Sequence, residues 1–599
     1  MKRILICLGL TSCLVFSFLP AQETSTQEKK DPEANLSIVN EVKPPQEQVK
    51  EGFDSITGHD AMAYLRFISS DLLKGRDTAK PGYAIAAEYV ASMFELWGIK
   101  PAGDFLQPTR ARGMRFAPPG QDQKQERKRG YFQSIIFREW LSTQGKAVVE
   151  WQKGRQKKSQ TFRLDQDYNF SLSGSQTLTA PVVFVGYGIQ ESALKFDEYK
   201  NIDVKGKFIM MLSETPRADD PDSPFNKGEL KEKYNPPRRM RRMDDPKTKL
   251  AIEMGAEAII LVENRPDKNG DIPAAKLPRP QNDEQPIIPG ERRRISLVEG
   301  GNMPLPWESL PTCRISREMA NAILGYSEND VDSLKAKIEK EMEPQSFELT
   351  GVTLTLSQTA ESKLVQCHNV LGYIEGSDPE LKDEVIVIGA HLDHLGQRGE
   401  YIYNGADDNG SGSVGVMECA EAFALNSVKP KRSILFALWT GEEKGLLGSR
   451  YYVNHPYFPI DKTVACLNLD MISRTYNKQQ LKMMANRFGE DIPKDALDKV
   501  DVQRFVRPSF SAQMPELREI MKNNNQFVGL SMFMSETEGG GGGSDHAPFA
   551  YANRPWVFFF AAMTSDYHQP SDSVEKVSAS LMERIIRMTY LTAFDLANR

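Results

Sequence analysis

Four apolar runs in the C-terminal half of the chain are each followed by side chains that suit a metal ion. The runs cover residues 385–390, 434–439, 464–469 and 556–560. Each is short and almost free of polar residues, which is typical of strands buried on both faces of a sheet. The histidines and carboxylates that follow the runs are His391, Glu442 and Glu443, Asp470, and His568.

Helical patterns alternate with these apolar runs, so we predict an α/β fold with a mostly parallel mixed sheet flanked by helices. In the helical stretch after the first run, Val414, Met417, Ala420 and Ala424 lie on one side. The carboxyl ends of parallel strands share one edge of an open sheet, where side chains far apart in sequence can meet. The sequence therefore predicts a single site at this edge.

The residue types at this edge favour zinc, which is bound by imidazole and carboxylate. Two histidines and three carboxylates exceed the three protein ligands of a usual catalytic zinc. They suit two metal ions about 3.5–4 Å apart that share a carboxylate. Taken singly, each group has an ordinary explanation: Glu442 and Glu443 suit a helix N-terminus, and Asp407-Asp408 suits a turn. Those explanations would have to hold at every strand end at once, so the set as a whole favours a metal site.

Five motifs carry a resemblance to a known family. In chain order they are G-A-H-L-D (389–393), N-G-A-D-D-N-G-S-G (404–412), W-T-G-E-E-K-G-L-L-G-S (439–449), L-N-L-D-M-I-S (467–473) and Y-H-Q-P-S-D (567–572). Together they resemble the co-catalytic di-zinc exopeptidases, which include bacterial leucyl aminopeptidases and glutamate carboxypeptidase. The resemblance covers about 350–599 and, more loosely, 55–110. The module between these parts resembles the protease-associated domain that family members carry as an insertion.

The resemblance implies two Zn²⁺ ions and a role for each motif residue. His391 and Asp470 would hold one ion, Glu443 and His568 the other, and Asp407 would bridge them. Glu442 would be the general base, and Tyr567 would stabilise the oxyanion. Asp393 would accept the second N–H of His391, and the peptide bond between Asp407 and Asp408 would be cis.

The predicted function is an exported zinc aminopeptidase that removes N-terminal residues from peptides. A carboxypeptidase or dipeptidase on the same scaffold is an alternative, as is a glutaminyl cyclase. An alternative of another class is a binding module that keeps the fold without turnover, although every motif position is present. We expect no nucleic-acid partner, because the net charge is −6 and the pI about 5.9. The basic runs 238–242 and 292–294 are interpreted as solvated loop charge.

The predicted domain organisation has five parts. Residues 1–21 form a signal peptide, 22–51 a disordered leader, 52–165 the first part of the peptidase domain, 166–349 the inserted protease-associated domain, and 350–599 the catalytic domain. The signal predicts a periplasmic or secreted protein. A lipid anchor at Cys13 and an uncleaved N-terminal anchor are the alternatives, and no other membrane contact is expected. The oligomeric state is left open.

Further histidines, the cysteines and the long segment 474–543 are each assigned a role outside the set of metal ligands. His394 and His455 are assigned to structure, and His546 to the surroundings of the pocket. The four cysteines after the signal are interpreted as buried small hydrophobes rather than zinc ligands. Residues 474–538, with the glycine run 539–543, are predicted to form a loop that shapes specificity beside the pocket. Arg504 and Arg507 within it are candidates for binding a C-terminal carboxylate.

Overall fold

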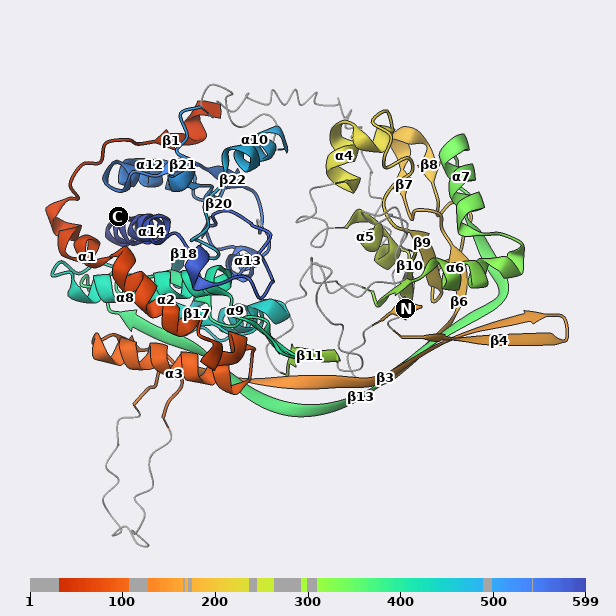
Figure 1. Cartoon of the computed structure of the whole chain (residues 1–599), viewed down its shortest axis with the longest axis horizontal. Helices are drawn as coiled ribbons and strands as arrows, with labels where there is room; N and C mark the ends of the chain where they lie inside the picture. The colour runs from red at the N-terminus through yellow and green to blue at the C-terminus, as the bar shows by residue number, and fades with distance from the viewer. Residues whose placement is uncertain are drawn as a thin grey trace, which may run out of the picture.

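The computed structural model consists of two lobes joined by two long antiparallel strands, β3 (Phe132–Lys153) and β13 (Phe347–Ile374) (Figure 1). It describes residues 32–106, 128–164, 167–170, 175–235, 245–262, 292–298, 310–487, 498–540 and 542–599. The first lobe contains the four predicted strands, and the second lobe contains most of the described part of the predicted insertion. The signal peptide and the basic run 238–242 lie outside the described residues.

The four apolar runs form the centre of the first lobe's sheet. β14 (Val385–His391) lies between β17 (Ser433–Trp439) and β18 (Thr463–Leu469), and β23 (Trp556–Phe559) follows β18. All three of these pairings are parallel, and β13 adds an antiparallel neighbour to β17. Every residue of β14 and β17 is buried. The predicted mostly parallel mixed sheet is therefore confirmed.

Helices cover both faces of this sheet, because alternate side chains of each buried strand point to opposite sides. One face packs against the helices α3 (Pro81–Leu96), α8 (Gly412–Leu425) and α14 (Ala579–Asn598), and α2 (Gly58–Ile68) packs on α8 and α14. The other face packs against α9 (Leu447–Asn454) and α13 (His546–Tyr551). The carboxyl edge of the strands lies between these two helical layers.

The second lobe is a smaller α/β unit with its own core. Its parallel strands are β6 (Gln176–Phe184), β9 (Phe208–Leu212), β10 (Ala258–Val262) and β12 (Thr312–Ile315). Its helices are α4 (Gly228–Tyr234), α5 (Pro246–Glu253), α6 (Arg317–Leu324) and α7 (Val331–Glu341). The core extends from Ala147 to Leu356. The transition between the lobes thus falls inside β3 and β13, outside the predicted limits 166 and 349.

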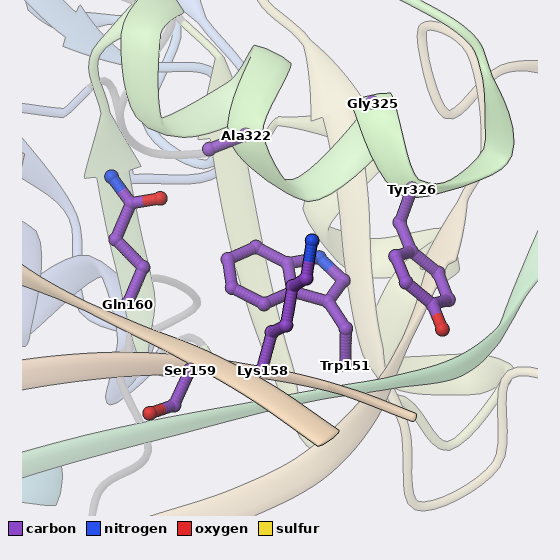
Figure 2. Close-up of a pocket in the computed structure, with 7 residues that line it drawn as sticks. All are labelled: Trp151, Lys158, Ser159, Gln160, Ala322, Gly325 and Tyr326. Carbon is purple, nitrogen blue, oxygen red and sulfur yellow. The ribbon is translucent and has the colours of Figure 1, made fainter. Parts of the chain in front are cut away.

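An open pocket of about 500 Å³ lies in this second lobe. Figure 2 shows the rings of Trp151 and Tyr326 beside it, with the Lys158 side chain overlapping the Trp151 ring in the view. The pocket is lined by residues of β3, the hairpin strand β4 (Gln156–Arg163), and the end of α6 with the turn that follows it. None of the predicted site residues contributes to it.

Two segments predicted to be irregular are ordered instead. Within the predicted leader, β1 (Leu36–Ile38) pairs with β21 (Ser531–Phe533), because its two apolar side chains pack on a small hydrophobic cluster. Within the predicted loop 474–538, α12 (Leu517–Val528) buries an apolar face against α14. The spacing of Leu517, Ile520, Met521 and Val528, all buried, is the amphipathic signal that the sequence analysis overlooked.

The basic run 292–294 is also part of a strand, β11 (Arg292–Leu297), which pairs with β3. The cysteines match their interpretation, since Cys313, Cys367, Cys419 and Cys466 are all buried and free. Among the helices that the structure describes, none is long and apolar enough to cross a membrane.

Candidate metal centre and active site

The first of two candidate metal clusters consists of His391, Asp408 and Asp470, all buried. His391 ends β14, and Asp470 comes directly after β18. The Nε2 atom of His391 lies 3.4 Å from Asp408 Oδ1 and 3.6 Å from Asp470 Oδ1. One ligand atom from each residue lies within 4.8 Å of the others. The parallel strands thus bring together residues 79 positions apart (391 to 470), as the sequence analysis predicted.

The second cluster contains Glu443, Asp408 and two histidines. His568 Nε2 lies 3.1 Å from Asp408 Oδ2 and 3.3 Å from Glu443 Oε2. His394 Nδ1 lies 2.8 Å from Glu443 Oε1 and 3.9 Å from Asp408 Oδ2. The sequence analysis assigned His394 to structure, but the residue belongs to a candidate ligand group. Its spacing of three positions from His391 was the signal that could have drawn attention to it.

The carboxylate shared by both clusters is that of Asp408, which corrects the predicted role of Asp407. Asp407 Oδ1 instead accepts hydrogen bonds from Ser473 N at 3.0 Å and Ser473 Oγ at 2.6 Å. The cis peptide bond is Asp408–Asn409, one position after the predicted one. The backbone turn over Ala406–Ser411 sends the two neighbouring carboxylates in different directions. Asp572 holds this turn by accepting hydrogen bonds from the backbone N–H groups of both aspartates.

A hydrogen-bonded support holds the loop after β17. Asp393 Oδ2 accepts a hydrogen bond from Thr78 Oγ1 at 2.9 Å, and Asp393 Oδ1 accepts one from Glu442 N at 3.1 Å. His391 Nδ1 lies 2.9 Å from the backbone oxygen of Asp393 and 4.0 Å from its carboxylate. The predicted contact with His391 is therefore made by the backbone oxygen, while the carboxylate orients Glu442.

Glu442 lies beside the first cluster without belonging to either candidate ligand group. Its Oε2 atom is 3.9 Å from His391 Nε2, and its side chain is 14% exposed. Burial raises the pKa of Glu442 well above its ordinary value, and the carboxylates of Glu443 and Asp545 add to this, against the effect of His391. Burial also raises the pKa of Asp545 to about 7. A cation bound beside Glu442 would favour its carboxylate form.

The electrostatics of the centre fit a resident cation. Burial lowers the pKa of His568, but the facing Glu443 and Asp408 carboxylates outweigh it and raise that pKa to about 10. The facing carboxylates of Glu442 and Asp470 likewise raise the pKa of His391 against the effect of burial. Asp470 Oδ1 is buried and accepts no hydrogen bond from any residue that the structure describes. An unpaired buried carboxylate oxygen is costly unless a cation or donor meets it, and this donor set suits zinc.

Tyr567 stacks on the ring of His568, with centroids 3.8 Å apart and planes 21° apart. Burial raises the pKa of Tyr567, and the carboxylates of Asp408 and Glu443 raise it further. The phenol therefore stays protonated at neutral pH and can donate a hydrogen bond. This is the property that its predicted role requires.

Arg76 is a structural feature of the centre that the sequence analysis did not single out. Its side chain is fully buried, and it donates to the backbone oxygens of Leu392, Ile68, Asn404 and Gly405 at 2.8, 2.5, 2.7 and 3.0 Å. Leu392 follows His391, and Gly405 lies three positions before Asp408. Arg76 therefore ties together the two chain segments that carry these residues.

Four other candidates lie outside the two clusters. The His546 ring packs between Trp556 and Phe558, and His455 is exposed and stacks on Tyr451. Arg504 pairs with Asp501 at 2.7 Å, and Arg507 lies over the ring of Phe533. Both arginines thus contact the small sheet that contains β1 or the turn before it.

Fold and site together define an α/β domain whose acid and imidazole clusters lie at the carboxyl edge of a largely parallel sheet. Residues 369–593 match the model of Peptidase family M28. The resemblance drawn from the five motifs is confirmed. The second lobe lies outside the matched residues, and its likeness to a protease-associated domain stays a prediction.

Curated relatives include both kinds of exopeptidase. The chain is 27% identical to leupeptin-inactivating enzyme 1 of Streptomyces exfoliatus over 47% of this chain and 52% of that enzyme. It is 41% identical to leucine aminopeptidase 2 of Trichophyton rubrum over 17% of this chain and 19% of that protein. It is 29% identical to the glutamate carboxypeptidase 2 homolog of Caenorhabditis briggsae over 35% and 26%. These matches span about half of the relatives' length or less.

Among solved structures, the aminopeptidase from Aneurinibacillus sp. strain AM-1 aligns with a TM-score of 0.49 at 17% identity. That alignment covers 92% of this chain and 96% of the other.

Proposed function

We propose that this protein is an exported aminopeptidase that uses two zinc ions to remove N-terminal residues from peptides. The observation that carries the proposal is the pair of buried clusters that share Asp408, with the Glu442 carboxylate beside them. The leucine aminopeptidases among the relatives favour an aminopeptidase. Export is proposed from the signal-like residues 1–21 alone.

His391, Asp408 and Asp470 would hold one zinc ion, and Asp408, Glu443 and His568 the other. We prefer His568 to His394 because its Nε2 atom lies within 3.3 Å of both carboxylates, whereas His394 Nδ1 is 3.9 Å from Asp408 Oδ2. When bound, the ions would supply Lewis acidity and lower the pKa of water at the site.

The chain's own residues supply proton transfer and charge stabilisation. Glu442 would take the proton of the attacking water and return it to the leaving amine. The Asp393 carboxylate holds the backbone of Glu442 in place for this transfer. The protonated Tyr567 would donate a hydrogen bond to the oxyanion that develops on the scissile carbonyl.

A panel of aminoacyl-nitroanilides, assayed with wild type and Glu442→Gln, tests the proposal. Loss of a general base should lower kcat by roughly 10²- to 10⁴-fold. Metal analysis of both proteins should give the same two zinc ions per chain. The exposed Glu380→Gln is the matched control, because it makes the same chemical change on the surface. A Glu442→Gln variant that keeps full rate with both ions bound would refute the assignment.

The same assay separates the aminopeptidase from the carboxypeptidase. Amides with a free α-amino group should be cleaved, and peptides with a blocked N-terminus should not. The reverse preference would show a carboxypeptidase.

A further inference from the structure

A strand from the second lobe's part of the chain lies against the loop that carries Glu442. β11 stands in sequence between β10 and β12, which are parallel neighbours in the second lobe. It does not join them but pairs with residues 137–142 of β3. There it contacts the 3-10 turn Glu442–Lys444 and α9 of the first lobe (Figure 1). The connection between two strands of one lobe thus reaches the active centre of the other.

Arg293 on β11 is the residue that makes the polar contacts at this junction. Its Nη1 atom pairs with Asp77 Oδ2 at 2.7 Å, and its Nη2 atom donates to the backbone oxygen of Thr78 at 2.7 Å. Its Nε atom pairs with the carboxylate of Glu139 on β3. The side chains of Arg293, Asp77 and Glu139 are only 18%, 17% and 6% exposed. Charge-assisted hydrogen bonds of this kind are shorter and stronger than neutral ones.

Two short paths lead from Arg293 to the catalytic loop. In the first, Thr78 receives the guanidinium on its backbone oxygen and donates its hydroxyl to Asp393, which accepts the Glu442 N–H. In the second, Asp77 binds Arg293 with one oxygen and lies 3.1 Å from Lys444 Nζ with the other. The two paths therefore support the loop at both ends of the Glu442–Glu443 pair.

We propose that Arg293 is a positioning residue for the loop 440–444, so that the second lobe takes a direct part in turnover. The inference rests on the proposed function, because it assigns Arg293 a role in orienting the base Glu442. It predicts that the geometry of the guanidinium matters as well as its charge. A lysine at this position has one ammonium group and cannot bind all three acceptors in the same fork.

The test compares steady-state kinetics of Arg293→Gln and Arg293→Lys with those of Arg294→Gln. Arg294 is the neighbouring exposed residue of the same strand, so its substitution removes the same charge from the surface. A fall in kcat of roughly 10- to 100-fold corresponds to about 1.4–2.7 kcal/mol, the size of one hydrogen bond to a charged group. We expect this fall for Arg293→Gln with KM within about twofold of wild type, and a partial rescue in Arg293→Lys. If Arg293 were only structural, its variants would give less folded enzyme. The kcat of each active site would then not fall in the order wild type, Arg293→Lys, Arg293→Gln.

A second pair of variants keeps the test decisive if Arg293→Gln fails to fold. Thr78→Val removes the hydroxyl that reaches Asp393 with little change in shape, whereas Thr78→Ser retains it. Thr78→Val should lower kcat, and Thr78→Ser should stay near wild type. The inference is overturned if both Arg293→Gln and Thr78→Val keep the kcat of wild type. An inactive wild type that binds two zinc ions would instead contradict the proposed function.

Discussion

The fully buried Arg76 allows the sharpest prediction about stability. Substitution by methionine keeps an unbranched side chain of similar length but removes every donor. The backbone oxygens of Leu392, Ile68, Asn404 and Gly405 then lose their partner. Four hydrogen bonds at about 1–1.5 kcal/mol each amount to roughly 4–6 kcal/mol.

Part of this loss is offset, because methionine does not have to be desolvated as a cation. Burial lowers the pKa of the Arg76 guanidinium to about 10, although Asp393 and Asp572 favour its charge. We therefore expect Arg76→Met to lower the free energy of unfolding by about 3–5 kcal/mol, the range measured when one partner of a buried ionic network is removed.

Urea-induced unfolding followed by tryptophan fluorescence measures this difference. Arg66→Met is the matched control, because Arg66 lies exposed on α2 and the same substitution there should change stability by less than about 0.5 kcal/mol. Zinc content should also fall in Arg76→Met, since the tied segments carry His391 and Asp408. Equal stability of the two variants, within about 1 kcal/mol, would refute the reasoning from buried carbonyls.

Three further predictions concern the centre and its junction. His568→Ala should bind one zinc ion fewer per chain than wild type, whereas His394→Ala should retain both ions with weakened affinity for one. Metal analysis after dialysis distinguishes the two variants. The opposite result would exchange the roles of the two histidines. Asp408→Asn should lose both ions and activity, whereas Asp407→Asn should keep metal and lose stability, which plasma emission spectrometry and thermal unfolding would show; equal metal loss in the two would contradict the assignment of the shared carboxylate. Burial would raise the pKa of Glu139, but the neighbouring guanidinium and ammonium groups outweigh it and lower that pKa from 4.5 to about 2. The stabilising contribution of Glu139 is therefore complete above about pH 4.5 and disappears as the pH falls toward 2. In denaturant titrations, the stability difference between wild type and Glu139→Gln should shrink over that range. A constant difference would argue against the ion pairs.

Most of the centre was predictable from sequence because its signals are local. An apolar run reports a buried strand, and the residue after it must lie at the strand's carboxyl end. His391 and Asp470 follow from this reasoning, and so does the pair Glu442–Glu443. His568 follows its apolar run less closely, since eight positions separate it from the end of that run, and the family resemblance assigned its role.

The choice between Asp407 and Asp408 depended on the tertiary structure. The two residues are chemically identical neighbours, and no local signal says which carboxylate faces the clusters. Asp572 and Ser473, distant in sequence, decide this by binding the backbone of both residues and the side chain of Asp407. The prediction of irregular structure in the leader and in the segment 474–538 was wrong for a related reason. Both segments are largely polar, and their few apolar side chains pack on a sheet and a helix that are distant in sequence.

The amino-acid sequence alone was sufficient for the α/β class, the edge of the sheet at which the site lies, and most of the groups that gather there. These follow from side-chain periodicity and strand direction, which are properties of short segments. Only the folded chain could show which aspartate is shared, how Arg76 ties the ligand segments together, and that Arg293 reaches the catalytic loop from the second lobe. Each of these depends on contacts between residues distant in sequence, because a guanidinium or carboxylate can bind such partners only after separate elements have packed together.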